Sequence, residues 1–259
     1  MKNIREIIEK IYNNEELRET CIPLFLGNPG IGKTQIIKEF AKDVGANMIE
    51  FIASTRNPFE ISGLAMPNKE RDRMVYLDYD MLESLKDGDI IFFDEILNGN
   101  PAVLNACLTL LESRQTISGK KLPKVMIVAA ANPQGKPPLT PQIKERFIWY
   151  DVSFNSLLWR DYMKKKYSMP VNISSMLITE IKQESFDEYN YYTPRSIEKT
   201  LMMLLKDVPL PREYQNIEVI LNTVVDNELK EDIEIAPDVI LKADEKISWL
   251  KLVKYAYNQ

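Results

Sequence analysis

The sequence contains no histidine and only two cysteines, Cys21 and Cys107. Without histidine, imidazole acid–base catalysis and histidine-ligated metal sites are excluded, which leaves carboxylates, lysine, hydroxyl groups and bound Mg²⁺. Both cysteines lie in apolar stretches and we find no signal peptide, so we expect reduced core residues of a cytoplasmic protein. No apolar run approaches the ~20 residues that a membrane-spanning helix needs, and we expect no membrane partner.

The sequence also has fewer basic than acidic residues: 33 lysines and arginines against 38 aspartates and glutamates, for a formal net charge of −5. The globally basic surface of many nucleic-acid-binding proteins is therefore missing, although a local basic lining is compatible with this total. The 259 residues suffice for one large domain, or for a large and a small one. The function therefore has to be inferred from local motifs.

A glycine-rich turn follows the apolar run at 22–26 and has the spacing of a phosphate-binding loop. Gly30 and Gly32 allow a tight turn whose backbone N–H groups approach phosphate oxygens. Lys33 can reach the terminal phosphates, and the Thr34 hydroxyl can ligate Mg²⁺. The alternative is a surface turn of glycine and proline that happens to precede Lys-Thr. The candidate nucleotide-binding residues are Asn28, Pro29, Gly30, Ile31, Gly32, Lys33 and Thr34.

Apolar runs that alternate with helical segments predict an α/β fold, a parallel sheet flanked by helices with right-handed crossovers. Because ligands bind beyond the carboxyl ends of the strands in such sheets, polar residues that follow the strands should converge. The expected strands cover about 21–26, 48–53, 89–94 and 125–130, and the first helices cover 2–18 and 33–43.

The spacing of apolar residues becomes helical from about residue 155. We therefore expect an α/β domain at 1–153 and a small all-α lid domain at 154–259, with helices that include 216–229 and 236–257. Within the first domain, the less regular segment 55–82 is expected to form a loop or hairpin, and 116–122 a hairpin tip.

An acidic pair, Asp94 and Glu95, ends the strand expected at 89–94. In a nucleotide-hydrolysing site Asp94 would hold Mg²⁺, and Glu95 would polarise the water that attacks the γ-phosphate. Alternatively, the pair caps the next helix, because acidic residues are favoured in first turns. The phosphate-binding loop upstream makes hydrolysis the better interpretation.

Three further residues are candidates for the same reaction. Asn132 ends an alanine-rich strand and could orient the attacking water, or it could form the turn before Pro133. Arg146 could enter the active site of a neighbouring subunit and offset transition-state charge, or it could pair with Glu145 or another acid. Arg195 lies at an expected helix start; it could reach the γ-phosphate from the lid, or it could be a solvated helix arginine.

Together these motifs resemble the AAA+ ATPases, which have a P-loop NTPase fold, and specifically the MoxR-type branch. The resemblance implies an ATP- and Mg²⁺-dependent ATPase that works as a ring, usually a hexamer, with ATP bound between subunits and Arg146 acting in trans. It also implies remodelling or chaperone-like work on a protein substrate, often with a von Willebrand factor A domain partner. The segments that carry the resemblance are 27–34 (Walker A), 90–95 (Walker B), 129–133 (sensor 1), 145–147 (arginine finger), 193–195 (sensor 2) and, for the branch, 96–119.

The sequence departs from the family pattern in segments that concern substrate handling more than the ATPase core. The asparagine that usually follows Walker B as Glu-Ile-Asn is displaced by one position, to Asn98. Asp78-Tyr79-Asp80 replaces the Gly-Pro of the family. The loop at 63–73 is short of aromatic residues, which leaves Leu64 and Met66 as poor candidates for pore-loop residues.

Two other functions use the same motifs. A nucleic-acid-dependent motor or replication-type ATPase would take its basic lining from Arg71, Arg73, Lys120 and Lys121 of the two expected hairpins, but the acidic total argues against it. A nucleotide-dependent assembly switch would use ATP to clamp subunits together and hydrolysis to release a partner. In that protein Arg146 would serve mainly assembly.

Overall fold

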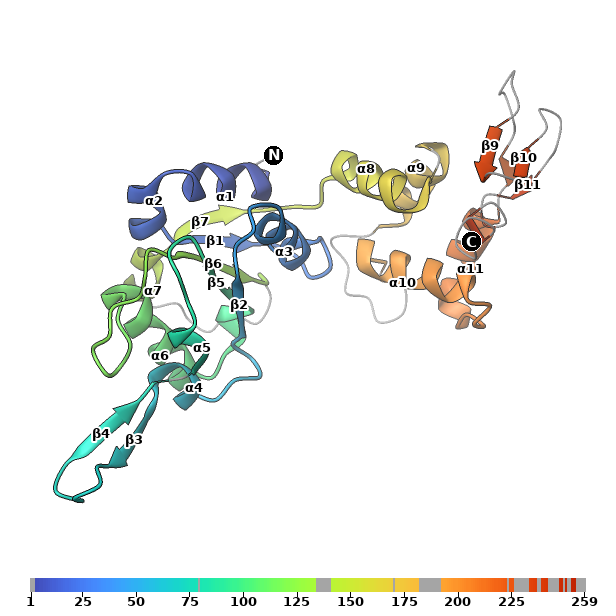
Figure 1. The fold of residues 1–259 in the computed structure, drawn as a ribbon. Coiled ribbons are helices and arrows are strands. Elements are labelled where there is room, and N and C mark those ends of the chain that lie inside the picture. The colour runs from blue at the N-terminus through green and yellow to red at the C-terminus, as the bar shows by residue number, and fades with distance from the viewer. Residues whose placement is uncertain are drawn as a thin grey trace. The chain divides into compact units, whose positions relative to one another are not determined.

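The chain, seen here in a computed structural model, forms two compact units, residues 1–153 and 154–259 (Figure 1). The first unit holds the main sheet, and the second is mostly helical in its described part. Among the described residues, no helix combines the length and apolar character needed to cross a bilayer. The structure describes residues 3–78, 80–133, 141–169, 171–181, 192–222, 224–225, 233–236, 239–241, 247–248, 250 and 253–254.

The first unit is built on a parallel five-stranded sheet with the strand order β2-β5-β6-β1-β7. Four of these strands confirm the prediction, whereas the sequence did not indicate β7. This strand pairs with β1 at the edge of the sheet and is half exposed, so it lacks the continuous apolar run by which the equally short β1 was predicted. The strands are β1 (Pro23–Leu26), β2 (Met48–Ile52), β5 (Ile90–Asp94), β6 (Met126–Ala131) and β7 (Ile148–Asp151).

Each face of the sheet is covered by its own helices (Figure 1). Phe92 of β5 belongs to a core shared with α1 and α3, while the next residue, Phe93, belongs to a core shared with α4, α5 and α6. Successive strand residues point to opposite faces, so a strand covered on both sides reads as one apolar run. The helices are α1 (Ile4–Tyr12), α2 (Glu15–Thr20), α3 (Lys33–Asp43), α4 (Phe59–Ser62), α5 (Asp80–Glu83), α6 (Pro101–Ser113) and α7 (Pro141–Arg146).

The single helix expected at 2–18 is wrong, because the segment forms two helices, α1 and α2. The break falls at Asn13 and Asn14. The Asn14 side chain accepts a hydrogen bond from the backbone N–H of Leu17 (3.1 Å) and starts a new helix. Asparagine is favoured at such caps because its side chain satisfies an N–H group that the helix leaves unpaired.

Both cysteines are free thiols. Cys107 is fully buried on α6, and burial raises the pKa of its thiol to about 12. Cys21 is only half buried, so the expected core position holds for Cys107 alone.

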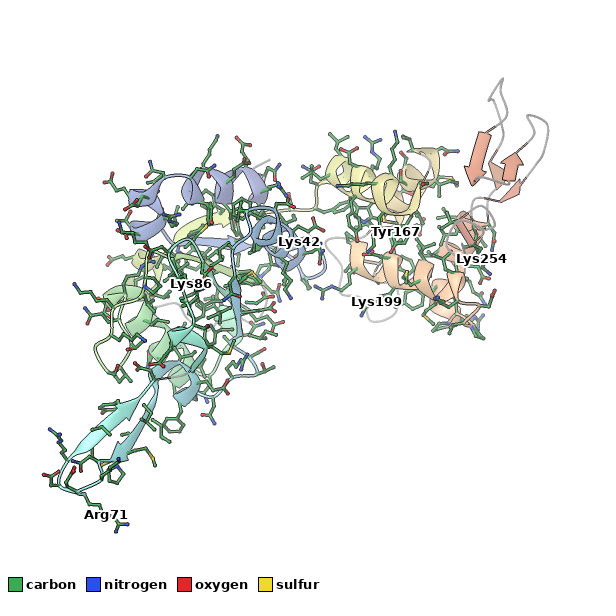
Figure 2. The ribbon with its side chains drawn as sticks, in the orientation of Figure 1. Lys42, Arg71, Lys86, Tyr167, Lys199 and Lys254 are labelled. Carbon is green, nitrogen blue, oxygen red and sulfur yellow. The ribbon has the colours of Figure 1, made fainter. Side chains whose placement is uncertain are left out.

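Two segments of the first unit, which we call the excursions, extend away from the sheet. The first is an antiparallel hairpin of β3 (Leu64–Pro67) and β4 (Met74–Leu77), which projects from the unit with Arg71 at its tip (Figures 1 and 2). The second is a tight turn closed by an isolated bridge between Gln115 and Lys121. Both confirm the sequence-based expectation.

Asp78 joins these two excursions. Its carboxylate accepts hydrogen bonds from Thr116 Oγ1 (2.7 Å) and from the backbone N–H (3.3 Å) and hydroxyl of Ser118. Burial raises the pKa of Asp78, but the hydrogen bonds from Ser118 and Thr116 outweigh it and hold that pKa below its ordinary value. The departure from the family pattern at this position therefore fastens the hairpin to the turn.

The second unit contains the helices α8 (Ser156–Tyr167), α9 (Val171–Glu180), α10 (Pro194–Leu205) and α11 (Gln215–Leu221). They confirm the helical character predicted for this region. The helix expected at 216–229 ends at Leu221, however, and the one expected at 236–257 is wrong for the residues that form strands. β-Branched residues dominate these strands and favour extended chain. The strands are β8 (Val224–Val225), β9 (Ile233–Ala236), β10 (Val239–Leu241) and β11 (Ile247–Ser248).

A carboxylate on α10, Glu198, ties this helix to α8. Its Oε1 accepts hydrogen bonds from Tyr162 Oη (2.6 Å), Lys166 Nζ (2.7 Å) and Tyr167 Oη (2.8 Å). Tyr167 is labelled in Figure 2. Burial raises the pKa of Glu198, but the hydrogen bonds from Lys166 and the two tyrosines outweigh it, so that pKa lies below its ordinary value. This cluster fixes the helix on which Arg195 lies.

Candidate nucleotide-binding site

The glycine-rich loop lies between β1 and α3, as a phosphate-binding loop requires. Gly30 and Gly32 have φ values of 80° and 97°, in the left-handed region that strains residues with a Cβ. Gly32 precedes α3 and has no side chain to bond the first N–H groups of that helix. Those groups and the positive end of the helix dipole are therefore available to an anion.

The Lys33 side chain is folded against this loop. The residue is only 6% exposed, and Nζ donates hydrogen bonds to Gly27 O (2.6 Å), Asn28 O (3.0 Å) and Asn132 Oδ1 (3.0 Å). The last contact joins the loop to the end of β6, so Asn132 does more than form the turn before Pro133. The predicted convergence of these two motifs is present in the geometry.

Thr34 and Asp94 make the second contact between motifs. Thr34 Oγ1 donates to Asp94 Oδ2 (2.7 Å), while Asp94 Oδ1 accepts from the backbone N–H of Glu95 (2.9 Å). In the described part of the chain, no group of three or more His, Cys, Asp or Glu side chains gathers to hold a metal. Thr34 and Asp94 offer hydroxyl and carboxylate oxygens, the kind of donor that would hold Mg²⁺ beside a bound phosphate.

The Glu95 side chain is hydrogen-bonded by a residue that follows β2, a contact that the sequence did not predict. Ser54, which lies just beyond β2, donates from Oγ to Glu95 Oε2 (2.5 Å). β2 and β5 are neighbours in the sheet, so both residues lie at the same edge. A polar residue after each predicted strand is the signal that would have found Ser54.

The backbone at Glu95 is itself unusual. Its φ of 52° and ψ of 33° are left-handed, and this conformation costs a residue with a side chain about 1 kcal/mol or more. Glu95 occupies the N-cap position of a short 3₁₀ helix, Ile96–Asn98, without a capping hydrogen bond from its side chain, and the pair does not cap α6. That helix is capped by Asn100, whose side chain accepts from the backbone N–H of Ala102 (2.9 Å).

Gly27 and Gly99 are points of close approach around the site. A Cβ on Gly27 would lie 2.4 Å from the backbone oxygen of Val152, directly beyond β7. A Cβ on Gly99 would lie 3.1 Å from the Cβ of Ala53, next to Ser54. Both contacts set the spacing of the segments that carry the polar side chains.

Arg146 has an acidic partner within its own subunit. It is the last residue of α7, and its Nη2 lies 2.7 Å from Glu112 Oε2 on α6. The ion pair considered from the sequence is therefore present, with Glu112 in place of Glu145. A role at the site of a neighbouring subunit is a proposal.

Arg195 is an exposed residue in the first turn of α10. Thr193 and Ser196 form a capping box that fixes the start of this helix. Because Arg195 belongs to the second unit, its action on the site of the first unit is also a proposal.

This chain matches a protein-family model and is similar in sequence to several known proteins. A family model described as the MoxR domain in the MoxR-vWA-beta-propeller ternary systems matches residues 6–149, more than half of the chain. Two uncharacterized proteins of Methanocaldococcus jannaschii are each 30% identical over 131 residues. The Holliday junction branch migration complex subunit RuvB of Campylobacter fetus is 27% identical over 136 residues. These matches cover 49%, 49% and 48% of this chain but only 33%, 34% and 34% of the relatives' lengths.

Comparison with solved structures identifies the fold. The RuvB Holliday junction branch migration motor of Thermotoga maritima matches with a TM-score of 0.53 and 17% identity, covering 85% of this chain and 69% of that one. A mutant of the same protein matches with a TM-score of 0.55 and 18% identity, covering 86% and 71%. At this level of identity the likeness establishes the fold alone, and it confirms the predicted P-loop architecture.

Proposed function

The chain belongs to the MoxR family of AAA+ ATPases, and from this premise we propose that it works as an ATP-driven ring that remodels or assembles a protein partner. An ATPase activity follows from the family and the fold. The ring, the protein partner and the roles of single residues are the proposed part. The roles proposed for the residues of the hydrolytic site are supported most directly by three contacts between distant motifs, all at the carboxyl edge of one sheet. These contacts join Lys33 with Asn132, Thr34 with Asp94, and Ser54 with Glu95.

ATP would bind to the loop at 28–34. Lys33 would exchange acceptors that it has within the chain for oxygens of the terminal phosphates, and Thr34 and Asp94 would hold Mg²⁺. Hydroxyl and carboxylate oxygens are the hard donors that Mg²⁺ prefers, so the residues fit the ion. Bound Mg²⁺ would supply positive charge next to the phosphate oxygens.

The other side chains of the edge would act on the attacking water. Glu95 would accept a hydrogen bond from this water and take its proton. Asn132 would orient the same water through its amide, and Ser54 would keep the Glu95 carboxylate in place. Each of these roles requires a polar side chain just beyond a strand, where the sheet holds the backbone rigid.

The ring would bring further residues to the site. Arg146 would reach the γ-phosphate bound to a neighbouring subunit, which we expect to be one of six, and Arg195 would approach from the lid. An arginine supplied in this way contributes roughly 10³–10⁵ in rate in well-studied nucleotide hydrolases. The family description names von Willebrand factor A and β-propeller components, which supports a protein partner with one of these domains.

Glu95→Gln tests the catalytic proposal. The amide keeps the size of the side chain but cannot take a proton, so ATP binding should be unchanged and turnover should fall by roughly 10²–10⁴. Binding is measured with a fluorescent ATP analogue and turnover by phosphate release. Turnover at the wild-type rate would refute the role of Glu95.

Light scattering with and without ATP·Mg²⁺, alongside the specific ATPase activity at increasing protein concentration, tests the ring. We expect a nucleotide-dependent increase in mass and an activity that rises as subunits associate. A monomer with a concentration-independent rate would refute the ring and the role of Arg146. A ring whose slow hydrolysis no partner changes would instead favour an assembly switch.

A nucleic-acid-dependent motor is the second candidate. It is favoured by the similarity to RuvB, which is described as a Holliday junction branch migration subunit, and by four exposed basic residues on the two excursions. In that case DNA should stimulate ATP hydrolysis, and its binding should weaken steeply with salt. The residues concerned are Arg71, Arg73, Lys120 and Lys121.

A further inference from the structure

Within one subunit, Arg146 is held in an ion pair with Glu112. An arginine that acts on the site of a neighbouring subunit would have to leave this carboxylate first. The two side chains come from different helices, α7 and α6, and meet at 2.7 Å between Nη2 and Oε2. The side chain of Arg146 is 22% exposed, whereas that of Glu112 is 64% exposed. The guanidinium is thus partly shielded within its own subunit, while its acidic partner lies in water.

The backbone on both sides of Arg146 is firmly held. Phe147 follows it and is buried in the core, and the indole Nε1 of Trp149 donates to the backbone oxygen of Lys144 (3.0 Å). The helix end therefore has little freedom, and any reorientation of Arg146 must come from its side-chain torsions. Glu112 forms an ion pair with the guanidinium and thereby restricts those torsions.

We propose that Glu112 is a positioning residue for Arg146: it holds the guanidinium in the free subunit and releases it to the γ-phosphate of a neighbouring subunit's ATP when the ring forms. This inference rests on the proposed role of Arg146 in trans. The exchange is feasible because an exposed carboxylate is a weak partner. A terminal phosphate carries more negative charge and several acceptor oxygens, and arginine binds such groups bidentately.

The proposal predicts a specific change when the carboxylate is neutralised. Glu112→Gln removes a competitor for Arg146 in the free subunit only, since the pair is already broken in the ring. The protein concentration that gives half-maximal ATPase activity should therefore fall about two- to fivefold, the range expected for loss of one exposed ion pair per subunit contact. The activity at saturating protein concentration should stay at the wild-type value.

Glu6→Gln is the matched control, and Arg146→Ala is the reference. The Glu6 side chain is 61% exposed, much like that of Glu112, and pairs with Lys10 (2.7 Å) on α1, so its variant makes the same change of net charge away from α6 and α7. Assembly is followed by light scattering with ATP·Mg²⁺ in wild type, in each single variant and in the Glu112→Gln, Arg146→Ala double variant. The effect of Glu112→Gln should be absent from Glu6→Gln and should vanish when Arg146 is missing.

The outcomes separate this inference from the proposed function. If Arg146→Ala keeps wild-type activity and assembly, the role of Arg146 in trans fails, and with it the role of Glu112. If Arg146→Ala loses activity but Glu112→Gln leaves the half-maximal concentration unchanged, or lowers the activity at saturation, the proposed function survives and the role of Glu112 is refuted. An equal shift in Glu6→Gln would assign the effect to net charge and would also refute it.

Discussion

Gly27→Ala should damage both the stability and the nucleotide binding of the first unit, because Gly27 is wedged against the edge strand. Its Cβ would lie 2.4 Å from Val152 O and 2.8 Å from both Val152 Cγ2 and Ile31 Cδ1. Real Cβ atoms essentially never approach other atoms to less than 3.0 Å, so the first contact alone requires a shift of at least 0.6 Å, from 2.4 to 3.0 Å. The obstacle is backbone, which cannot rotate away.

The cost follows from what that shift disturbs. Moving Val152 away stretches the hydrogen bond from its N–H to Leu26 O (2.8 Å), which continues the pairing of β1 with β7. Overpacking costs about 1–3 kcal/mol and a weakened hydrogen bond about 1 kcal/mol, so we expect a loss of about 2–4 kcal/mol in the free energy of unfolding. The Gly27 oxygen also accepts from Lys33 Nζ (2.6 Å), so nucleotide affinity should fall as well.

Urea unfolding followed by circular dichroism measures this loss, and hydrogen exchange at the Val152 amide locates it. The matched control is Gly45→Ala: Gly45 has a φ of 70°, but no atom lies within 4 Å of its Cβ position. It should cost only the ~1–2 kcal/mol of a left-handed backbone. If Gly27→Ala were no more destabilising than Gly45→Ala, the close packing of the loop against the edge strand would be refuted.

Two further predictions concern single carboxylates. Ser54→Ala removes the hydroxyl that holds the Glu95 carboxylate in place. A hydrogen bond at an exposed site contributes about 0.5–1.5 kcal/mol, so kcat should fall roughly two- to tenfold with KM unchanged, and an unaltered kcat in steady-state assays would contradict this. Because its pKa is lowered in the folded chain, Glu198 should stabilise the fold above the ordinary glutamate pKa of ~4.3, and this contribution should be lost as the pH falls through the lowered pKa. Glu198→Gln should therefore lower the Tm at pH 7 more than in acid, and an equal loss at both pH values would count against the cluster around Glu198.

Much of the first unit could be predicted because its signals are local in sequence. The loop at 27–34 and the buried strands β5 and β6 are continuous segments whose glycine spacing or apolar character suffices. The partners of Asp94 and Asn132 follow from one further rule, that parallel strands bring their carboxyl ends to the same edge. The second unit was harder, because the short β9 and β10 strands carry only three or four residues each.

The sequence by itself determined which residues are available for the proposed chemistry: a loop with the spacing of a phosphate-binding loop, an acidic pair and an asparagine at strand ends, and no histidine. Those properties depend on residue type and on spacing along one segment. Only the tertiary structure decided which side chains act on them, namely that Ser54 holds Glu95 and that Glu112 pairs with Arg146. The physical reason is that hydrogen bonds and ion pairs act over about 3 Å, and only the strand order and the packing of α6 against α7 bring residues so far apart in the chain to that distance.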